Sequence, residues 1–151
     1  MNGTGFCELQ PGLFGLVTDM LANGRAPTGL PPRIRPLPAV RFTLQAPVRI
    51  PSGTWTVIQW DRESAAPGRF TCPADGLYLV TLNGTFAPRD GGVRSLAVRR
   101  NRVMLCAGAA CAVLAPLRAV DSLEGLAYHN SGAPLWFGGD EGTGMSITRM
   151  A

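Results

Sequence analysis

The sequence predicts an all-β sandwich or barrel, preceded by a segment of a different kind. Nineteen glycines and thirteen prolines interrupt the 151 residues often, which favours short strands and turns over long helices. From residue 40 onward, apolar residues alternate with polar ones at the period of a β-strand. Turn residues divide this part into about nine or ten such runs, which is the pattern of a sandwich or barrel.

The first 39 residues are expected to form an arm. Pro11 stands where the first turn of a helix tolerates proline, and Asn23-Gly24 supplies a stop, so a helix is predicted over about residues 11–22. Its apolar stripe at helical spacing consists of Leu13, Phe14, Val17, Met20 and Leu21. A helix of about three turns is marginal in water, so this stripe must dock on its own domain, a sister subunit or a host structure. We favour docking on a partner.

The segment 26–39 is predicted to be an extended strap. Its five prolines remove backbone donors and favour a polyproline-like path, so it is expected to act as a semi-rigid spacer. Recognition by aromatic-grooved domains is the alternative. The predicted organisation is therefore an anchoring arm over residues 1–39 and a head domain over residues 40–151.

The head divides into strands at recognisable turns. Pro51-Ser52-Gly53, Asp75-Gly76 and Asp90-Gly91-Gly92 are turn signals between apolar runs. The run 112–120 is ambiguous, because its alanines and leucines suit a helix, but Pro116 in its middle favours a strand with an irregularity. The predicted strands lie at about 40–44, 54–60, 69–72, 77–86, 94–100, 103–106, 112–120, 123–129, 135–137 and 145–150.

Charge is sparse and comes with an unusual preference for arginine. Charged residues make up 16% of the chain, the formal net charge is +4, and all fourteen basic residues are arginine. So low a share suggests that other subunits cover some of the apolar surface. The arginines are scattered apart from Arg99, Arg100 and Arg102, which cannot share one face because alternate strand residues point opposite ways. We therefore expect a solvated strand end and no nucleic-acid partner.

The cysteines and the apolar runs limit the classes of protein further. Cys7, Cys72, Cys106 and Cys111 are too few for a disulfide scaffold and lack zinc-site spacing. A bond between Cys106 and Cys111 across a hairpin stays open, although buried free thiols are favoured. The N-terminus lacks the pattern of a secretory signal, and no apolar run approaches the ~18 residues of a membrane span. Synthesis and folding in a cytoplasm, with no membrane partner, are expected.

Enzyme chemistry finds little support in the sequence. His129 is the one histidine, and it falls at the end of a predicted strand, where a structural role is favoured. Asp140 and Glu141 lie in a glycine-rich loop over 138–144, which lacks the lysine and helix of a phosphate loop. A weak calcium site there stays open. Ser131 has no nucleophile elbow around it, so no catalytic residue, metal or cofactor is expected.

One motif carries a resemblance to a known family. The segment GRFTCPADGLYLV, residues 68–80, resembles the central G-x-F-x-x-P-x-x-G-x-Y motif of the complement component 1q globular head, a jelly roll of the tumour-necrosis-factor superfamily. The segments 50–57, 120–124 and 128–132 look like strands of the bacterial and bacteriophage members. The resemblance covers roughly residues 40 to 151 and implies a jelly-roll β-sandwich.

The motif also makes physical sense. Phe70 and Tyr78 would place two large aromatic side chains in a sandwich core. Pro73 would end one strand because it cannot donate to a ladder, and Gly76 would permit the turn that reverses the chain. These four residues are the predicted core of the motif.

The resemblance implies a threefold trimer that packs through aromatic and aliphatic faces of the sandwich. The candidate interface residues are Trp55, Trp60, Tyr78, Phe86, Tyr128, Trp136 and Phe137. The chain shows neither the collagen-like stalk of the complement proteins, nor the membrane anchor of the cytokines, nor an obvious calcium-binding carboxylate cluster. Receptor signalling and complement activity are therefore not expected.

These points predict a non-enzymatic bacteriophage structural protein. A helix, a strap and a trimeric head suit a capsid decoration, or minor capsid protein, or a tail-associated protein. Residues 1–39 would anchor it to major capsid or tail proteins, and three arms would bind with avidity. The alternative is a receptor- or glycan-binding head of a phage tail or bacterial surface assembly. The expected location is the virion, after synthesis in the host cytoplasm.

Overall fold

The structure is a computed structural model that describes residues 38–61 and 68–151. The predicted helix, its apolar stripe and the proline-rich strap up to residue 37 lie outside the described residues. Within them, the strands are β1 (Ala39–Thr43), β2 (Val48–Ile50), β3 (Thr56–Val57), β4 (Arg69–Thr71), β5 (Gly76–Asn83), β6 (Arg94–Arg100), β7 (Val103–Gly108), β8 (Cys111–Leu117), β9 (Ser122–His129), β10 (Leu135–Phe137) and β11 (Gly144–Arg149).

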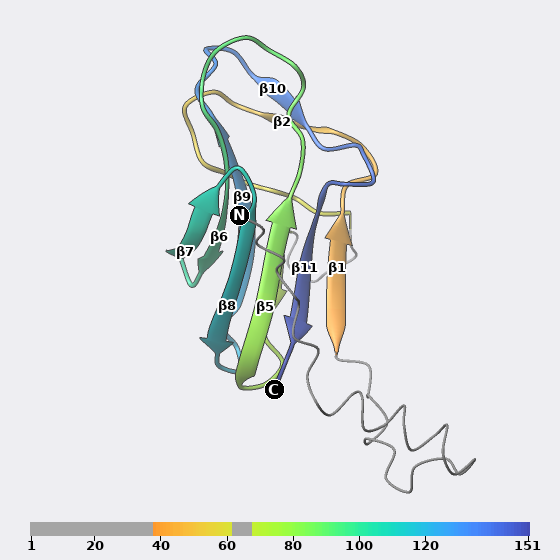
Figure 1. Ribbon diagram of the computed structural model, residues 1–151, viewed down its shortest axis with the longest axis vertical. Helices are drawn as coiled ribbons and strands as arrows, with labels where there is room; N and C mark the ends of the chain where they lie inside the picture. Colours follow the sequence, from red (N-terminus) through yellow and green to blue (C-terminus); the bar gives the residue numbers. More distant parts are fainter. Residues whose placement is uncertain (1–37, 62–67) are drawn as a thin grey trace, which may run out of the picture. The chain divides into compact units, whose positions relative to one another are not determined.

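The strands form a two-layered sandwich (Figure 1). One layer is a four-stranded sheet in the order β1-β11-β5-β8, and the other is a five-stranded sheet in the order β3-β9-β6-β7, with β4 also paired to β9. A short ribbon of β10 and β2 completes the fold. The pairs are antiparallel, and neighbours such as β1 and β11 are far apart in the sequence. Such long-range antiparallel pairing is the mark of a Greek-key or jelly-roll sandwich.

Alternation along the strands builds the core between the layers. On β5, Tyr78, Val80 and Leu82 point inward and are at most 2% exposed. They meet Leu96 of β6 and Leu123 of β9 from the other sheet within one buried cluster. Each such side chain contributes about 1.5–3 kcal/mol by leaving water, so this alternation supplies the main stabilisation of the sandwich.

The predicted all-β sandwich is confirmed, and the differences lie in short elements. The predicted strand 54–60 is reduced to β3, because the chain leaves the ladder after one last bond from Ile58 N to Gly125 O. The predicted strand 77–86 ends at Asn83, and Phe86 instead forms an isolated bridge with Phe137. Strand β2 was not expected, because it has three residues and its partner β10 is distant in the sequence.

The ambiguous run around Pro116 is a strand. Pro116 lies in β8, opposite Leu77 of β5. Strand β8 is the last strand of its sheet, where a missing backbone donor costs no ladder bond. No helix among the described residues is long and apolar enough to cross a membrane.

Candidate functional site

His129 is enclosed by the protein. Its ring is 0% exposed, Nε2 donates to Ile50 O at 2.8 Å, and the edge of the Phe86 ring lies against it at 5.7 Å between centroids. Nδ1 lies 3.0 Å from Ser131 Oγ. Both ring nitrogens are thus occupied by the protein itself, so His129 joins β9 to the end of β2 and has no path to a substrate.

The pair formed by Ser131 and His129 was missed by sequence reasoning, which set aside each residue alone. A serine beside a histidine is the start of a nucleophilic arrangement. Here, however, the other ring nitrogen faces the Ile50 carbonyl where a triad would place a carboxylate, and Ser131 Oγ also lies 3.4 Å from Ala133 O. With the imidazole fully buried, the pair fixes the turn after β9.

The glycine-rich loop 138–144 is organised by Asp140. Its Oδ1 accepts from Thr143 N at 2.7 Å, and hydrogen bonding from Thr143 holds the pKa of Asp140 below its ordinary value. Gly138 and Gly139 both adopt positive φ, which brings the chain into this turn. Among the described residues, no three His, Cys, Asp or Glu side chains come together as metal ligands. The carboxylate of Asp140 therefore caps a turn.

The cysteines of the described part carry free thiols. Cys72, Cys106 and Cys111 are unbonded, and Cys7 lies outside the described residues. Cys111 Sγ donates to Leu96 O at 3.4 Å. Burial raises the pKa of Cys72 to about 11, so this thiol is protonated at neutral pH. Cys72 and Cys111 are buried and serve as core residues rather than as nucleophiles.

The motif residues surround the start of β5. Phe70 is half-buried and meets Phe42 edge-on at 6.2 Å, while the Tyr78 hydroxyl donates to Ala74 O at 2.7 Å. Pro73 follows the end of β4 and is exposed. Gly76 has a different role from the predicted one: it begins β5, and a Cβ there would lie 2.3 Å from Ala151 O. Close approach of the last residues, rather than a turn, requires glycine at this position.

The predicted interface aromatics do not gather on one surface. Trp60 and Phe137 are 5% and 0% exposed, because both point into the core, and Tyr78 is buried as well. Phe86 is half-buried against Phe137, with ring centroids 4.9 Å apart. These core positions replace the predicted interface role.

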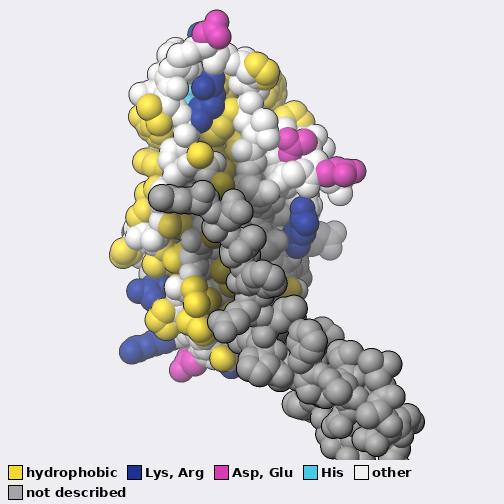
Figure 2. Space-filling view, viewed as in Figure 1, with side chains coloured by type: hydrophobic (Ala, Val, Ile, Leu, Met, Phe, Trp, Pro, Cys, Tyr) yellow, Lys and Arg dark blue, Asp and Glu magenta, His cyan; other side chains and the backbone are white. Residues whose placement is uncertain are grey.

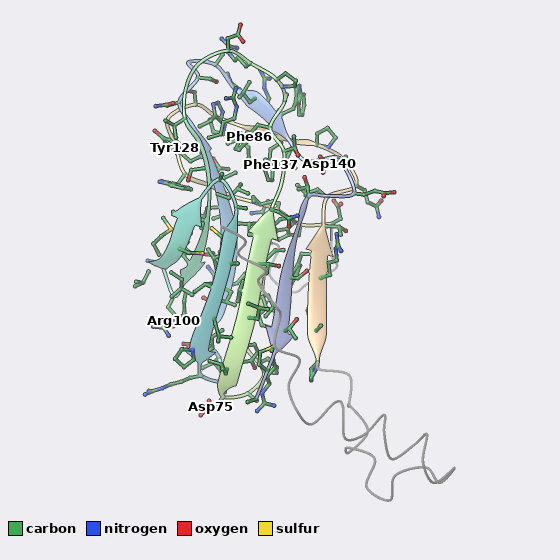
Figure 3. The ribbon with its side chains drawn as sticks, viewed as in Figure 1. Asp75, Phe86, Arg100, Tyr128, Phe137 and Asp140 are labelled. Atoms are coloured by element: carbon green, nitrogen blue, oxygen red, sulfur yellow. The ribbon has the colours of Figure 1, made fainter. Side chains whose placement is uncertain are left out.

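The other three predicted aromatics reach the surface in two places. Trp55 is 37% exposed and lies 5.1 Å from the half-buried Tyr128, on the outer side of β9. Trp136 is 53% exposed on β10. Figure 3 shows Tyr128, Phe86 and Phe137 in the same half of the head as β10 and β2.

A surface without charge lies instead on the outer side of β11, β5 and β8 of the four-stranded sheet, with Arg41 of β1 beside it opposite Ser146. Leu79 of β5 stands opposite Leu114 of β8 on one side and Thr148 of β11 on the other. Leu79 is 36% exposed and Leu114 is 55% exposed, so the residues that the structure describes leave both side chains open. We call this surface the neutral face. It consists of Leu77, Leu79, Thr81, Ala112, Leu114, Pro116, Ser146 and Thr148.

A sequence signal for the neutral face was available. In β5, Leu77 and Leu79 are apolar, and so are Tyr78, Val80 and Leu82, which point the other way. When the residues that point to either side of a strand are all apolar, both faces of that strand are covered. Sequence reasoning concentrated on aromatic side chains and therefore missed the aliphatic residues of this strand.

A second apolar patch borders the neutral face. Strand β7 is the last strand of the five-stranded sheet, and its Val103 and Met104 are 62% and 44% exposed. Figure 2 shows hydrophobic side chains along the side of the head where β7 and β8 lie. Free sheet edges are usually guarded by charges, prolines or bulges; β7, with the sequence VMLCAG, carries no charge and no proline, although its register with β6 shifts between Val98 and Arg99. We call Val103 and Met104, on the β7 strand next to β8, the edge patch.

Comparison with known proteins identifies the fold. No family model matches the sequence, and no curated protein matches it. The chain is similar in structure to murine APRIL, with a TM-score of 0.55 and 17% identity over 74% of this chain and 98% of that one. It is also similar to Eiger TNF from S. frugiperda, with a TM-score of 0.52 and 17% identity over 78% of this chain and 94% of that one.

The head is a tumour-necrosis-factor-like jelly roll. This confirms the fold that the motif around Phe70 and Tyr78 implied. The two structural relatives are matched over nearly their whole length, so the likeness covers the complete sandwich. At 17% identity it speaks for the fold alone.

Proposed function

We propose that this chain is a non-enzymatic homotrimer whose heads associate through the neutral face, and that it serves as a structural part of a larger assembly. The observation that carries the proposal is the neutral face itself. The Leu79–Leu114 pair lies in an uncharged part of the sheet surface that the described residues leave open. Contiguous exposed apolar surface of this kind marks a place where another protein binds.

A threefold ring explains why there are two apolar patches. Around a threefold axis, each subunit presents one patch to its neighbour on one side and a different patch to its neighbour on the other. The neutral face and the edge patch around Val103 and Met104 are two such surfaces. The similarity to the tumour-necrosis-factor superfamily, whose jelly rolls pack as threefold trimers, supports the same arrangement here.

The assembly that we propose is a virion. The segments 50–57, 120–124 and 128–132 resemble those of the bacterial and bacteriophage members of the superfamily. The predicted helix and strap of residues 1–39 would anchor the trimer to major capsid or tail proteins, as a capsid decoration or a tail-associated protein. Three arms on one trimer bind at high effective concentration once the first has docked, so a weak single contact is sufficient.

Charges placed on the neutral face test the trimer. The double substitution Leu79→Glu and Leu114→Glu would bury two carboxylates per interface without partners, which costs several kcal/mol. We expect sedimentation velocity to show monomers where the unchanged chain sediments as a trimer, with the β-sheet circular dichroism retained. Val93→Glu, at a loop valine that is 61% exposed away from this face, is the matched control. A double variant that remains trimeric would exclude the neutral face as the interface.

The second candidate function is a receptor- or glycan-binding head. The specific observation is the Trp55–Tyr128 pair, whose rings lie 5.1 Å apart and 34° from parallel, with Trp55 37% exposed. The C–H groups of a sugar ring pack against such aromatic faces. If this function is correct, the chain will sediment with isolated bacterial envelopes, and Trp55→Ala will abolish this while Trp136→Ala does not. Equal sedimentation of both variants, or none by the unchanged chain, speaks against it.

A further inference from the structure

One end of the head combines several unusual features, and it is the end where the described chain begins. Arg149 N donates to Pro38 O at 3.0 Å, and Arg149 Nη2 donates to Asp75 O at 2.7 Å. Asp75 Oδ1 in turn accepts from Ala119 N at 2.7 Å. These bonds place the start of β1, the β4–β5 loop and the β8–β9 loop together (Figure 1). We call this region the Pro38 end.

The net charge of the described head is concentrated toward the Pro38 end. Ten arginines and seven carboxylates lie in residues 38–61 and 68–151, a net charge of +3. Toward the opposite end, four arginines balance four carboxylates; these are Arg41, Arg49, Arg89, Arg94, Asp61, Asp90, Asp140 and Glu141. Figure 3 shows Arg100 and Asp75 toward the Pro38 end and Asp140 toward the other. The excess therefore comes from six arginines and three carboxylates near the Pro38 end: Arg69, Arg99, Arg100, Arg102, Arg118, Arg149, Asp75, Asp121 and Glu124.

Two loops of this end are locked together by Asn101. Its Nδ2 donates to Asp121 Oδ1 at 2.6 Å, and its Oδ1 accepts from Ser122 N at 2.9 Å. Asp121 Oδ2 accepts from Arg118 N at 2.9 Å. The carboxylate of Asp121 is thus engaged within the loops, while the guanidinium groups of Arg102 and Arg118 extend into solvent from exposed residues. The loops form a preorganised basic surface.

A hollow of about 430 Å³ lies between these loops. Arg100 and Arg118 line it, together with Asn101, Pro116, Leu117 and Asp121. Arg100 Nη1 donates to Pro116 O at 3.2 Å, which leaves other N–H groups of this guanidinium free to bind a ligand. An acidic side chain from outside would meet two guanidinium groups there, and arginine is well suited to bind carboxylates.

Val120 is strained and exposed beside this hollow. Its φ is 68°, and its side chain is 82% exposed. A β-branched residue in the left-handed region is a true outlier, and strain of this kind persists where function uses it. Among the described residues, the non-glycine positions with positive φ are Asn101, Arg102 and Val120, which all lie at this end. The backbone N of Val120 donates to Cys72 O at 2.9 Å and is held within the head, whereas its side chain is left exposed.

We propose that the Pro38 end is a second docking surface, which binds a protein surface that presents carboxylates around an aliphatic patch. A carboxylate of the partner enters the hollow between Arg100 and Arg118, and its aliphatic side chains cover Val120. The inference rests on the proposed function, since a chain anchored by residues 1–39 would turn the end at Pro38 toward the assembly that holds it.

The chemistry of the surface favours a protein over a nucleic acid or a lipid membrane. Among the described residues of this end, no aromatic side chain is exposed for base stacking. Val120, at 82% exposed, needs an apolar counter-surface of limited size, as the centre of a protein interface provides.

Binding of the full-length chain to four defined probes tests this inference. The probes are a copolymer of glutamate and leucine, poly-glutamate, phosphatidylglycerol vesicles and a DNA duplex. We expect the copolymer to bind best, and Arg102→Glu with Arg118→Glu to weaken that binding at least about tenfold by replacing attraction with repulsion. Arg49→Glu with Arg89→Glu makes the same charge change at exposed residues of the other end and is expected to have little effect.

A substitution of Val120 tests the aliphatic part of the contact independently. Val120→Asn removes the aliphatic contact and places a residue that tolerates the left-handed region. We expect it to abolish the preference for the copolymer over poly-glutamate while the melting temperature stays the same or rises. Val93→Asn, at an exposed valine of the opposite end, should leave the preference intact.

Specific outcomes overturn the inference. Copolymer binding that is insensitive to Arg102 and Arg118 excludes the Pro38 end, and tighter binding to DNA or to vesicles assigns it to a different class of partner. Light scattering on the same samples separates this from the trimer proposal. If the chain is monomeric and its binding depends on these arginines, the trimer proposal fails and the docking surface stands. If the chain is trimeric and its binding does not depend on them, the docking surface fails and the trimer stands.

Discussion

At the scale of single residues, Glu124 is the carboxylate on which the five-stranded sheet depends most. It is 6% exposed on β9 and lies between Arg99 at 2.5 Å and Arg69 at 3.1 Å. Burial by itself raises the pKa of Glu124, but the hydrogen bonds and charges of Arg99 and Arg69 outweigh burial and hold the pKa below its ordinary value of 4.5. The ionised form is therefore favoured in the folded head.

Glu124→Gln is expected to destabilise the head by about 1–2 kcal/mol at neutral pH, because two arginines lose their shared partner. Since the folded pKa is depressed, the contribution of the carboxylate is complete above about pH 4.5 and is lost as the pH falls through the lower folded value. Urea unfolding at neutral pH and at about pH 3 should show the difference between variant and unchanged chain shrink in acid.

Glu141→Gln removes an exposed carboxylate of the opposite end and serves as the control. It should leave the free energy of unfolding nearly unchanged at both pH values. A Glu124→Gln variant that loses as much stability in acid as at neutral pH would show that the lost contribution is packing rather than charge.

At the scale of elements, the residue that follows β5 is constrained by the packing of β10 against it. A Cβ on Gly84, the residue after β5, would lie 2.3 Å from Cζ of Phe137. Phe137 of β10 is 0% exposed and contacts Phe86 at 4.9 Å between ring centroids, so its ring has no room to move. The β10–β2 ribbon is thereby fixed against the end of the four-stranded sheet.

Gly84→Ala is expected to lower the free energy of unfolding by about 1–3 kcal/mol through overpacking. Thermal unfolding followed by circular dichroism measures the change. Gly142→Ala is the matched control, because the nearest atom to its Cβ would be Asp140 Oδ1 at 3.7 Å. Equal melting temperatures for the two variants would mean that the Phe137 ring moves aside at little cost.

Elements with strong local signals could be predicted from the sequence, and those defined by distant partners could not. Strands β6 and β9 follow from alternation and turn residues at their ends, and both were expected. Strand β2 exists because β10 pairs with it, and its three residues carry no local signal that predicts a strand. The run around β3 has strong strand propensity, but tertiary packing takes most of it out of the ladder.

The candidate site, too, could be predicted from the sequence only in part. Alternation reveals that a strand has two faces, but it does not tell which face is the core. Trp55 and Trp60 occur in one run, and the first is 37% exposed while the second is 5% exposed. The neutral face became visible only when Leu79 and Leu114, distant in the sequence, were placed opposite each other.

At the scale of the whole molecule, the surface of the head is divided by chemistry. The neutral face lies on β11, β5 and β8 and the edge patch lies on β7, whereas the excess positive charge lies toward the Pro38 end. This division accounts for the low share of charged residues, 16%, in a chain of this length. Burial of the neutral face between subunits would leave the Pro38 end and the Trp55–Tyr128 pair free for partners.

The mass of the full-length chain in solution tests the central claim most directly. Light scattering on the purified protein across a range of concentrations should give a stable mass of three times the 16.0 kDa of one chain, because the neutral face and the edge patch bury each other around a threefold axis. A mass of 16.0 kDa at every concentration would contradict the account, since Leu79 and Leu114 would then remain exposed to water with no subunit to cover them.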